Sequence, residues 1–362
     1  MNGFIKRNSE YKEWIRNLSE RFRKSQLKAA VKVNSEMLKF YWSLGEDIAQ
    51  LQIESKWGSG VLNAISRDLQ QALPGVKGLS VTNLGYIKRF YLIYSQCNVI
   101  YPQLGGKLGN LDKTESPESS ELELLFSIPW GHHKYIIDKC YDNPEKAFFY
   151  VKKTILNNWS RAVLLNFLDT DLYERDGKAV SNFKETLPAL QSDLAQDITK
   201  DPYNFDFLSI TENYREKELK DALIGNITRF LLELGTGFAY MGREYRLQIG
   251  QTEKFLDMLF YNLTLRSYVV VEVKVKQFDS ADVGQLGTYV AAVNHLLRRP
   301  EDNPTIGLLI CKTKDNVLAQ YALESSNQPI GISEYELSKL YPSDFKGTLP
   351  SIEEIENKLK YD

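Results

Sequence analysis

Two apolar runs in the second half of the sequence contain isolated charged residues. In residues 268–275 every second position from 269 on is valine, and Glu272 and Lys274 stand between these valines. Alternate side chains of a strand face opposite ways, so the valines share one face and the two charged residues share the other. Asp257 is similarly the single charged residue within 255–261. Burying charge is costly, so these three residues are candidates for a chemical role.

These three side chains suit metal-assisted hydrolysis of a phosphodiester bond. The chain can reverse between residues 262 and 266, so the two runs can pair as a hairpin and bring Asp257 towards Glu272. Two converging carboxylates offer oxygen ligands to a hard cation such as Mg²⁺. Lys274 can orient or help deprotonate a water molecule, or neutralise charge developing on a phosphate. Glu-x-Lys also occurs on ordinary half-exposed strands, and the isolated Asp257 strengthens the catalytic interpretation.

The elements that must position these residues follow a mixed order. An apolar stripe at helical spacing runs from about Glu216 to Gly235 and is followed by short runs rich in β-branched and aromatic residues. The pattern predicts strands, a helix and a further strand, in the order 245–249, 255–261, 267–275, 282–297 (the helix) and 305–311. In that helix, Gln285 and Tyr289 are four residues apart and share one face, beside the strand that carries Glu272.

The first half of the chain is predicted to be helical. A helix over residues 61–73 stops at Pro74-Gly75, and Ser80 or Thr82 can cap the next helix, which runs to about Tyr94. Residues 103–121 are predicted to be a surface loop or disordered insertion, and helical spacing resumes from there to about Leu172. We therefore expect an α+β chain: a mostly α-helical domain over residues 1–175, a linker over 176–210, and an α/β domain over 211–362 with a mixed central sheet.

Composition favours a cytoplasmic protein with a polyanionic partner. Residues 1–100 hold 15 Lys and Arg against 8 Asp and Glu, a balance of +7, whereas the remainder carries −9. A basic segment suits nucleic acid, although a solvated helical surface explains the charge equally well. No apolar run is long enough to cross a membrane, and the beginning of the sequence does not resemble a signal peptide. Three scattered cysteines form no disulfide or metal-ligand pattern, and we interpret the three histidines as structural.

The order of these motifs resembles that of a known nuclease group. Asp257, Glu272-Val273-Lys274 and Gln285-x-x-x-Tyr289 follow the pattern of the PD-(D/E)xK superfamily, although Leu256 stands in place of the proline. Further segments in both halves of the chain resemble the bacterial YhcG family, which combines such a domain with a helical N-terminal domain. They are residues 230–239, 257–261, 302–309, 321–323 and 329–331 in the second half, and 57–60, 128–132 and 158–161 in the first.

The resemblance implies a restriction-endonuclease-like fold and a role for each matching residue. Asp257 and Glu272 match the metal ligands, which bind Mg²⁺ or Mn²⁺, and Lys274 matches the catalytic lysine. Glu233 matches an acidic residue that many members place on the first helix, although an ordinary solvated helix face explains it equally well. Gln285 and Tyr289 match the pair on the helix that follows the motif, with simple helix packing as the alternative.

The resulting expectation is a metal-dependent nuclease that acts on nucleic acid, with DNA as the preferred substrate. Helices 61–73 and 80–94 resemble a helix-turn-helix, which makes Lys88 and Arg89 candidate DNA contacts, and Lys312 follows a strand end where phosphate can bind. Cutting both strands of a duplex favours a homodimer. The alternative is a nuclease fold used for binding or assembly, with little or no turnover.

Overall fold

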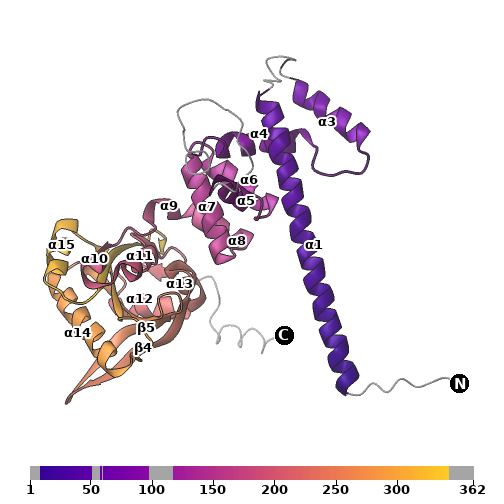
Figure 1. Ribbon diagram of the computed structural model, residues 1–362. Coiled ribbons are helices and arrows are strands. Elements are labelled where there is room, and N and C mark those ends of the chain that lie inside the picture. Colours follow the sequence, from indigo (N-terminus) through magenta and orange to yellow (C-terminus); the bar gives the residue numbers. More distant parts are fainter. Residues whose placement is uncertain (1–8, 51–57, 59, 98–116, 342–362) are drawn as a thin grey trace, which may run out of the picture. The chain divides into compact units, whose positions relative to one another are not determined.

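The computed structural model describes residues 9–50, 58, 60–97 and 117–341 and divides into two compact units (Figure 1). The division falls between Tyr173 and Glu174. The first unit is helical and the second contains a mixed sheet, so the expected α+β fold class is confirmed. None of the described helices is long and apolar enough to cross a membrane. The three cysteines are buried.

The first unit is built from helices packed around an aromatic core. Its largest fully buried side chains are those of Phe90, Tyr94, Phe148 and Tyr150. Ser80 caps α4, as its side chain accepts a hydrogen bond from the backbone N–H of Asn83. The helices are α1 (Ser9–Gln50), α3 (Val61–Ala72), α4 (Val81–Tyr94), α5 (Pro117–Leu125), α6 (Trp130–Cys140), α7 (Pro144–Asn157) and α8 (Arg161–Asp169). The short α9 (Leu172–Arg175) contains the division between the units.

The sequence predictions for this unit match the described helices closely. The helix expected over residues 61–73 is α3, and the one expected from Ser80 to Tyr94 is α4. Most of the loop or insertion expected over residues 103–121 lies outside the described residues, and α5 begins at Pro117.

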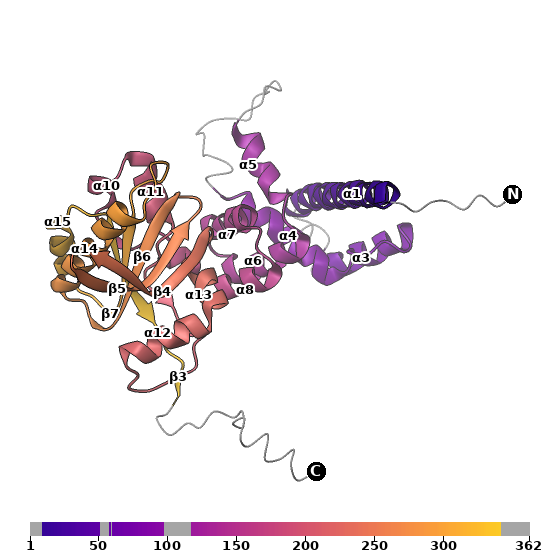
Figure 2. The ribbon, with the colours of Figure 1, turned by 90° about the horizontal axis from the view of Figure 1, so that it is seen from below.

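The second unit is organised around one sheet with strand order β1-β8-β7-β6-β5-β4. The neighbouring strands β4, β5 and β6 are antiparallel, whereas β6, β7 and β8 are parallel, which makes the sheet mixed (Figure 2). The strands are β1 (Val180–Ser181), β2 (Tyr203–Asn204), β3 (Ile210–Thr211), β4 (Phe238–Ile249), β5 (Thr252–Asn262), β6 (Ser267–Gln277), β7 (Ile306–Thr313), β8 (Ile330–Glu336) and β9 (Leu340–Tyr341).

Helices cover both faces of this sheet. On one face α12 (Glu216–Gly225) and α13 (Ile227–Leu234) pack against Val269, Val271 and Val273. On the other face α14 (Ser280–Leu296) and α15 (Asn316–Glu324) pack against a second cluster that includes Val270. Strand β6 therefore has apolar packing on both sides, as central strands do, and polar side chains at its end need partners.

The predicted linker over residues 176–210 is wrong. These residues belong to the second unit: β1 and β2 both pair with β8, and α10 (Phe183–Thr186) and α11 (Ala189–Asp197) lie between them. Phe183 and Phe205 are fully buried in the core on the α12 face of the sheet. A few large apolar residues anchor this segment, while the polar residues around them give it the composition of a linker.

Candidate active site

The hairpin of β5 and β6 brings the two predicted carboxylates together. Ladder pairing between these strands ends at Met258 and Val271, so Asp257 and Glu272 come next along the strands, opposite each other. The backbone N–H of Asp257 donates to Glu272 Oε1 at 3.1 Å. The backbone N–H of Val273 donates to Asp257 Oδ2 at 3.1 Å. Each carboxylate thus bonds to the opposite strand where the backbone ladder stops, and the predicted convergence is confirmed.

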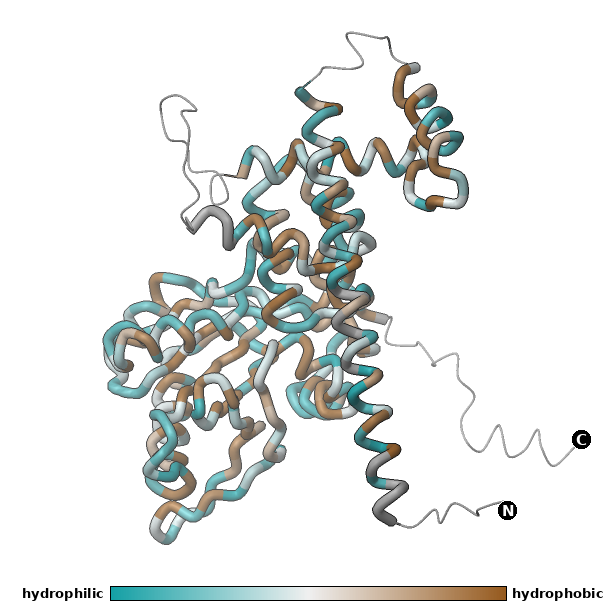
Figure 3. The backbone as a smooth tube through the Cα atoms, turned by 45° about the vertical axis from the view of Figure 1, so that its right-hand side comes forward, coloured by the Kyte–Doolittle hydropathy of each residue, from teal (hydrophilic) through white to brown (hydrophobic). Residues whose placement is uncertain are grey.

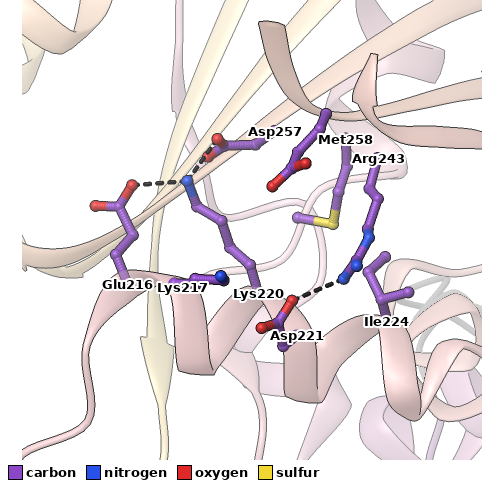
Figure 4. Close-up of a pocket in the computed structure, with 9 residues that line it drawn as sticks. Glu216, Lys217, Lys220, Asp221, Ile224, Arg243, Asp257 and Met258 are labelled. Carbon is purple, nitrogen blue, oxygen red and sulfur yellow. Dashed lines mark hydrogen bonds and ion pairs between the residues drawn. The ribbon is translucent and has the colours of Figure 1, made fainter.

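Lysines on two elements neutralise these carboxylates. Lys274 Nζ lies 3.4 Å from Glu272 Oε2 and 3.7 Å from Glu216 Oε1. Lys220 Nζ lies 2.5 Å from Asp257 Oδ1 and 2.7 Å from Glu216 Oε1, so it bridges a strand and a helix (Figure 4). The five side chains form one cluster in which acidic and basic groups alternate.

The two members of this cluster that come from α12, Glu216 and Lys220, were not predicted from the sequence. Their helix is fixed against the sheet by Leu219 and Leu223, which are fully buried in the core. Glu216 and Lys220 are four residues apart, which places them on one helical face. That spacing is the only signal the sequence offers, and exposed helices carry such pairs so often that it identifies no site.

Burial gives the cluster unusual electrostatics. The Glu272 residue is 2% exposed and Lys274 is 9% exposed. Burial, together with the neighbouring Asp257 carboxylate, raises the pKa of Glu272 to about 7. Burial alone lowers the pKa of Lys274, but Glu272, Glu216 and Asp257 outweigh it, so the pKa is raised and the ammonium stays charged. Keeping Glu272 ionised next to Asp257 therefore costs folding free energy, and a bound cation would reduce that cost.

A cavity of 260 Å³ opens beside Asp257 between α12, β4 and β5 (Figure 4). Glu216, Lys220 and Asp257 line it together with Arg243, which pairs with Asp221 on α12. The carboxylate oxygens of this cavity suit a bound cation, and its lysine and arginine side chains suit a negatively charged oxygen group such as a phosphate.

The side chains present fit a hard divalent cation through their oxygen atoms. Asp257 and Glu272 supply adjacent carboxylates, and the Lys220 ammonium already lies against the first of them as a positive charge. Within the described part of the chain, no group of three or more His, Cys, Asp or Glu side chains is arranged to hold a metal ion. The candidate protein ligands are thus two carboxylates, which is enough for Mg²⁺ because that ion keeps several waters.

Comparison with known proteins shows which family the chain resembles in each of its halves. Residues 196–350 match the YhcG PDDEXK nuclease domain, and residues 17–175 match the DUF1016 N-terminal domain. YhcG of Escherichia coli (strain K12) is 29% identical over 321 residues, which is 84% of each chain. The chain belongs to the YhcG family. In this YhcG-family chain, the whole carboxylate–lysine cluster lies inside the PDDEXK nuclease domain.

Two solved structures are also similar to part of the chain. A repair endonuclease from Pyrococcus abyssi is 20% identical and has a TM-score of 0.24, with 35% of this chain and 49% of that chain covered. EndoMS in a complex with double-stranded DNA is 19% identical and has a TM-score of 0.25, with 39% of this chain and 49% of that chain covered. This chain thus spans about half the length of either structure.

Gln285 and Tyr289, the pair predicted on the helix that follows the motif, contact each other in the structure. Gln285 Nε2 donates to the Tyr289 hydroxyl at 3.1 Å on α14. Tyr289 is buried in the core between α14 and the sheet. An added Cβ at Gly307 would lie 2.9 Å from Leu286 Cγ, so this glycine allows α14 to pack closely on β7. No hydrogen bond among the described residues joins Gln285 or Tyr289 to the cluster, and their part in the chemistry stays a prediction.

Glu233 is held differently from the cluster carboxylates. It is 3% exposed on α13 and forms a buried ion pair with Arg175, with both guanidinium NH groups donating to its carboxylate. It also accepts the backbone N–H of Asn204 at 2.9 Å. These bonds connect the 176–210 segment to α13, which gives Glu233 a structural task. The helical carboxylate that joins the cluster is Glu216, and a catalytic role for Glu233 stays a prediction.

The remaining predicted contacts lie on partly exposed surfaces. Arg89 lies over the ring of Tyr86 at 4.4 Å and pairs with Asp138 at 3.6 Å, while Lys88 is half-buried on the same helix, α4. Lys312 Nζ is exposed and lies 5.9 Å from the ring centre of Tyr214. DNA contact by Lys88, Arg89 and Lys312 stays a prediction.

Proposed function

We propose that this chain is a metal-dependent nuclease that hydrolyses phosphodiester bonds in DNA. One observation carries the proposal: Asp257, Glu272 and Lys274 converge where the β5–β6 ladder ends, inside a domain that matches a nuclease family. A buried cluster of this kind is expensive to maintain, and general packing does not require it.

Each residue has a distinct task in the proposed reaction. Asp257 and Glu272 would hold a Mg²⁺ or Mn²⁺ ion, which supplies Lewis-acid polarisation of the phosphate and makes a water molecule more acidic. The Lys274 ammonium stays charged and lies beside Glu272, so it can stabilise charge that develops on the phosphate or orient the attacking water. Lys220 lies against Asp257 at the edge of the cavity and neutralises its charge before a cation binds.

The proposed substrate class is based on the charge of residues 1–100, and the proposed cellular location is based on the cysteines. The balance of +7 over residues 1–100 favours a polyanion such as DNA, because lysines and arginines displace the counterions condensed on it. Lys88, Arg89 and Lys312 are the proposed contacts with its phosphates. Three buried cysteines whose spacing forms no disulfide or metal-ligand pattern suit the reducing cytoplasm, where we place the protein.

The test compares two lysines on the same strand. Lys274→Ala should lower the rate of Mg²⁺-dependent cleavage by about 10²–10³-fold, because one stabilising contact with the transition state is lost. Lys276→Ala is the matched control, since Lys276 lies two residues further along β6 with a half-exposed side chain paired with Asp282. Labelled linear, branched, single-stranded and RNA substrates, each with Mg²⁺ or Mn²⁺, should be assayed with both variants and the wild type.

The second candidate function is a binding or assembly module with little turnover. The observation that favours it is the cluster's own neutrality, since Lys220 and Lys274 already balance much of its negative charge. A wild-type protein that binds both DNA and Mn²⁺ but cuts no substrate of the panel would establish this function instead. Equal cleavage rates for Lys274→Ala and Lys276→Ala would also contradict the nuclease proposal.

A further inference from the structure

Helix α1 is much longer than the part of it that packs. Its C-terminal portion contributes Leu38, Tyr41 and Trp42 to the core of the first unit. Towards the N-terminus, Leu18 and Phe22 are 44% and 62% exposed, and apolar residues recur along the helix between polar ones (Figure 3). An unpacked helix is only marginally stable in water, since most helical stability comes from burying an apolar face.

Six exposed apolar side chains on α1 form one stripe. At 3.6 residues per turn they fall within roughly 100° of the helix circumference, the width of a face that packs against a partner. Three lie in the N-terminal half and three where the helix joins its unit: Ile15, Leu18, Phe22, Val33, Met37 and Phe40. We call this set the α1 stripe.

A groove lies at one end of the α1 stripe. It is a cavity of 540 Å³ between α1 and the segment that joins α3 to α4. The three C-terminal stripe residues form one wall, and the other wall is formed by Leu73, Val76 and Leu79. Leu73 and Val76 are exposed although they are apolar. The groove is therefore open, apolar and continuous with the stripe, as a docking site for an amphipathic helix must be.

We propose that α1 pairs antiparallel with α1 of a second copy of this chain, so that the N-terminal half of each stripe fills the groove of the other copy. The spacing of the stripe carries this inference because it is symmetric. Ile15 faces Phe40, Leu18 faces Met37 and Phe22 faces Val33 when two copies run in opposite directions, since each pair of residue numbers sums to 55. A single two-fold axis near residues 27 and 28 makes all of these contacts twice, as an isologous dimer requires.

Two further features fit a second copy. Near the proposed axis the same register places Gln26 opposite Ala29, and Ser25 also lies there, so these small and polar described side chains leave the two helices room to approach. Each copy would contribute the six residues of the α1 stripe and the three residues of the opposite groove wall to this interface. The groove lies at one end of the stripe only, so a parallel pair would bring the two grooves together and fill neither. This inference is independent of the proposed nuclease function.

Sedimentation of the full chain tests the pairing. The wild type should be a dimer, and the Leu18→Glu/Phe22→Glu double variant should raise the dissociation constant by about 100-fold or more, because charges would be buried without partners. Leu156→Glu is the matched control, since Leu156 is 74% exposed on α7 in the same unit and lies off the stripe. Tryptophan fluorescence and circular dichroism should show both variants folded.

Cysteine cross-linking tests the direction of the pair. A Leu18→Cys/Met37→Cys double variant should form a covalent dimer under mild oxidation, because the two positions face each other across the interface. Neither single variant should do so, since residue 18 of each copy would lie roughly 28 Å from residue 18 of the other at a rise of 1.5 Å per residue. The native cysteines are buried and serve as an internal control.

Four results would overturn the proposal. A wild type that stays monomeric up to about 100 μM, a concentration at which a micromolar interface is saturated, would remove it. So would a dimer that survives Leu18→Glu/Phe22→Glu, because another surface would then hold it. Covalent dimers of the Leu18→Cys single variant would show a parallel pair. Binding of the wild-type monomer to anionic lipid vesicles, lost in the double variant, would assign the stripe to a membrane surface instead.

Discussion

Glu233 and Glu272 are two buried glutamates of one domain with different surroundings. Glu233 accepts two guanidinium bonds from Arg175 and a backbone N–H from Asn204, so both of its oxygens are satisfied by fixed donors. Glu272 accepts one backbone N–H and a hydrogen bond from the Lys274 ammonium at 3.4 Å, but it also faces a second carboxylate, that of Asp257. A buried carboxylate that faces only donors holds a fold together, whereas one beside another carboxylate favours the arrival of a cation.

The largest effect should come from neutralising Glu272. Glu272→Gln keeps the shape of the side chain but removes the charge that would hold the cation, so cleavage should fall by at least about 10³-fold. The melting temperature should stay the same or rise, because burial already disfavours the charged form. A cleavage assay with thermal melting checks both results, and a variant that cuts at the wild-type rate would contradict the account.

Glu233→Gln should have the reverse profile. Removing one partner leaves the buried Arg175 guanidinium without its counter-charge, which typically costs about 3–5 kcal/mol of folding stability. At a temperature where the variant is folded, Mn²⁺ affinity should match that of the wild type. Chemical denaturation and metal titration of the same sample measure both. A stable variant with impaired metal binding would move Glu233 into the active site, as the sequence resemblance implies.

The two units should also respond to acid in opposite ways. His133 is buried in the helical unit, where its Nε2 lies 2.7 Å from Leu125 O. Burial lowers its pKa from 6.5 to about 4. Between these values the unfolded chain takes up a proton that the folded chain does not, so stability is complete above pH 6.5 and falls towards pH 4. The loss should approach about 3 kcal/mol, at 1.4 kcal/mol per pH unit.

The metal-free nuclease domain should show the opposite sign. The pKa of Glu272 is raised from 4.5 to about 7 in the folded chain. The folded state is therefore not destabilised by this residue below pH 4.5, and it loses stability as pH rises from 4.5 through 7. All five tryptophans precede residue 160, so tryptophan fluorescence reports the helical unit, while hydrogen exchange of β6 amides reports the nuclease domain. Denaturation midpoints that agree at pH 7 and pH 5 for both probes would contradict this contrast.

The smallest effect should come from Lys220. Its ammonium lies against Asp257 and Glu216, where it competes with a cation for the same charge. Lys220→Met keeps the length of the side chain and should tighten Mn²⁺ binding by about tenfold, equivalent to about 1.4 kcal/mol. Lys217→Met is the control, because Lys217 lines the same cavity but has no ion pair to Asp257 among the described contacts. Weaker binding in Lys220→Met would show that Lys220 positions Asp257 for the metal.

The β5–β6 hairpin could be predicted from the sequence because its charged residues interrupt a regular apolar pattern. Charges at Asp257, Glu272 and Lys274 interrupt apolar strands with a period of two, and a short reversal joins them, so alternation alone brings them together. The helix capped by Ser80 could be predicted equally well, since its cap and the Pro74-Gly75 stop of the preceding helix are local signals. Both predictions depend on residues that lie close together in the chain.

Features that depend on distant contacts could not be predicted. Glu216 and Lys220 look like any exposed helical pair until Leu219 and Leu223 fix their helix against β6. Strands β1 and β2 are two residues long, so they have no periodicity to detect, and their pairing depends on β8. Sequence spacing left a solvated face open as one of two explanations of Glu233, whereas Arg175, 58 residues earlier in the chain, holds it inside the protein.

Mn²⁺ titration of three proteins tests the central claim most directly: wild type, Asp257→Asn and Glu233→Gln, each measured by calorimetry at pH 7.5 in the absence of DNA. We expect a binding event in wild type that Asp257→Asn loses and Glu233→Gln keeps, because the cation requires the paired carboxylates Asp257 and Glu272. Wild-type binding in Asp257→Asn, or its loss in Glu233→Gln alone, would contradict the assignment of the metal site to the end of the β5–β6 hairpin.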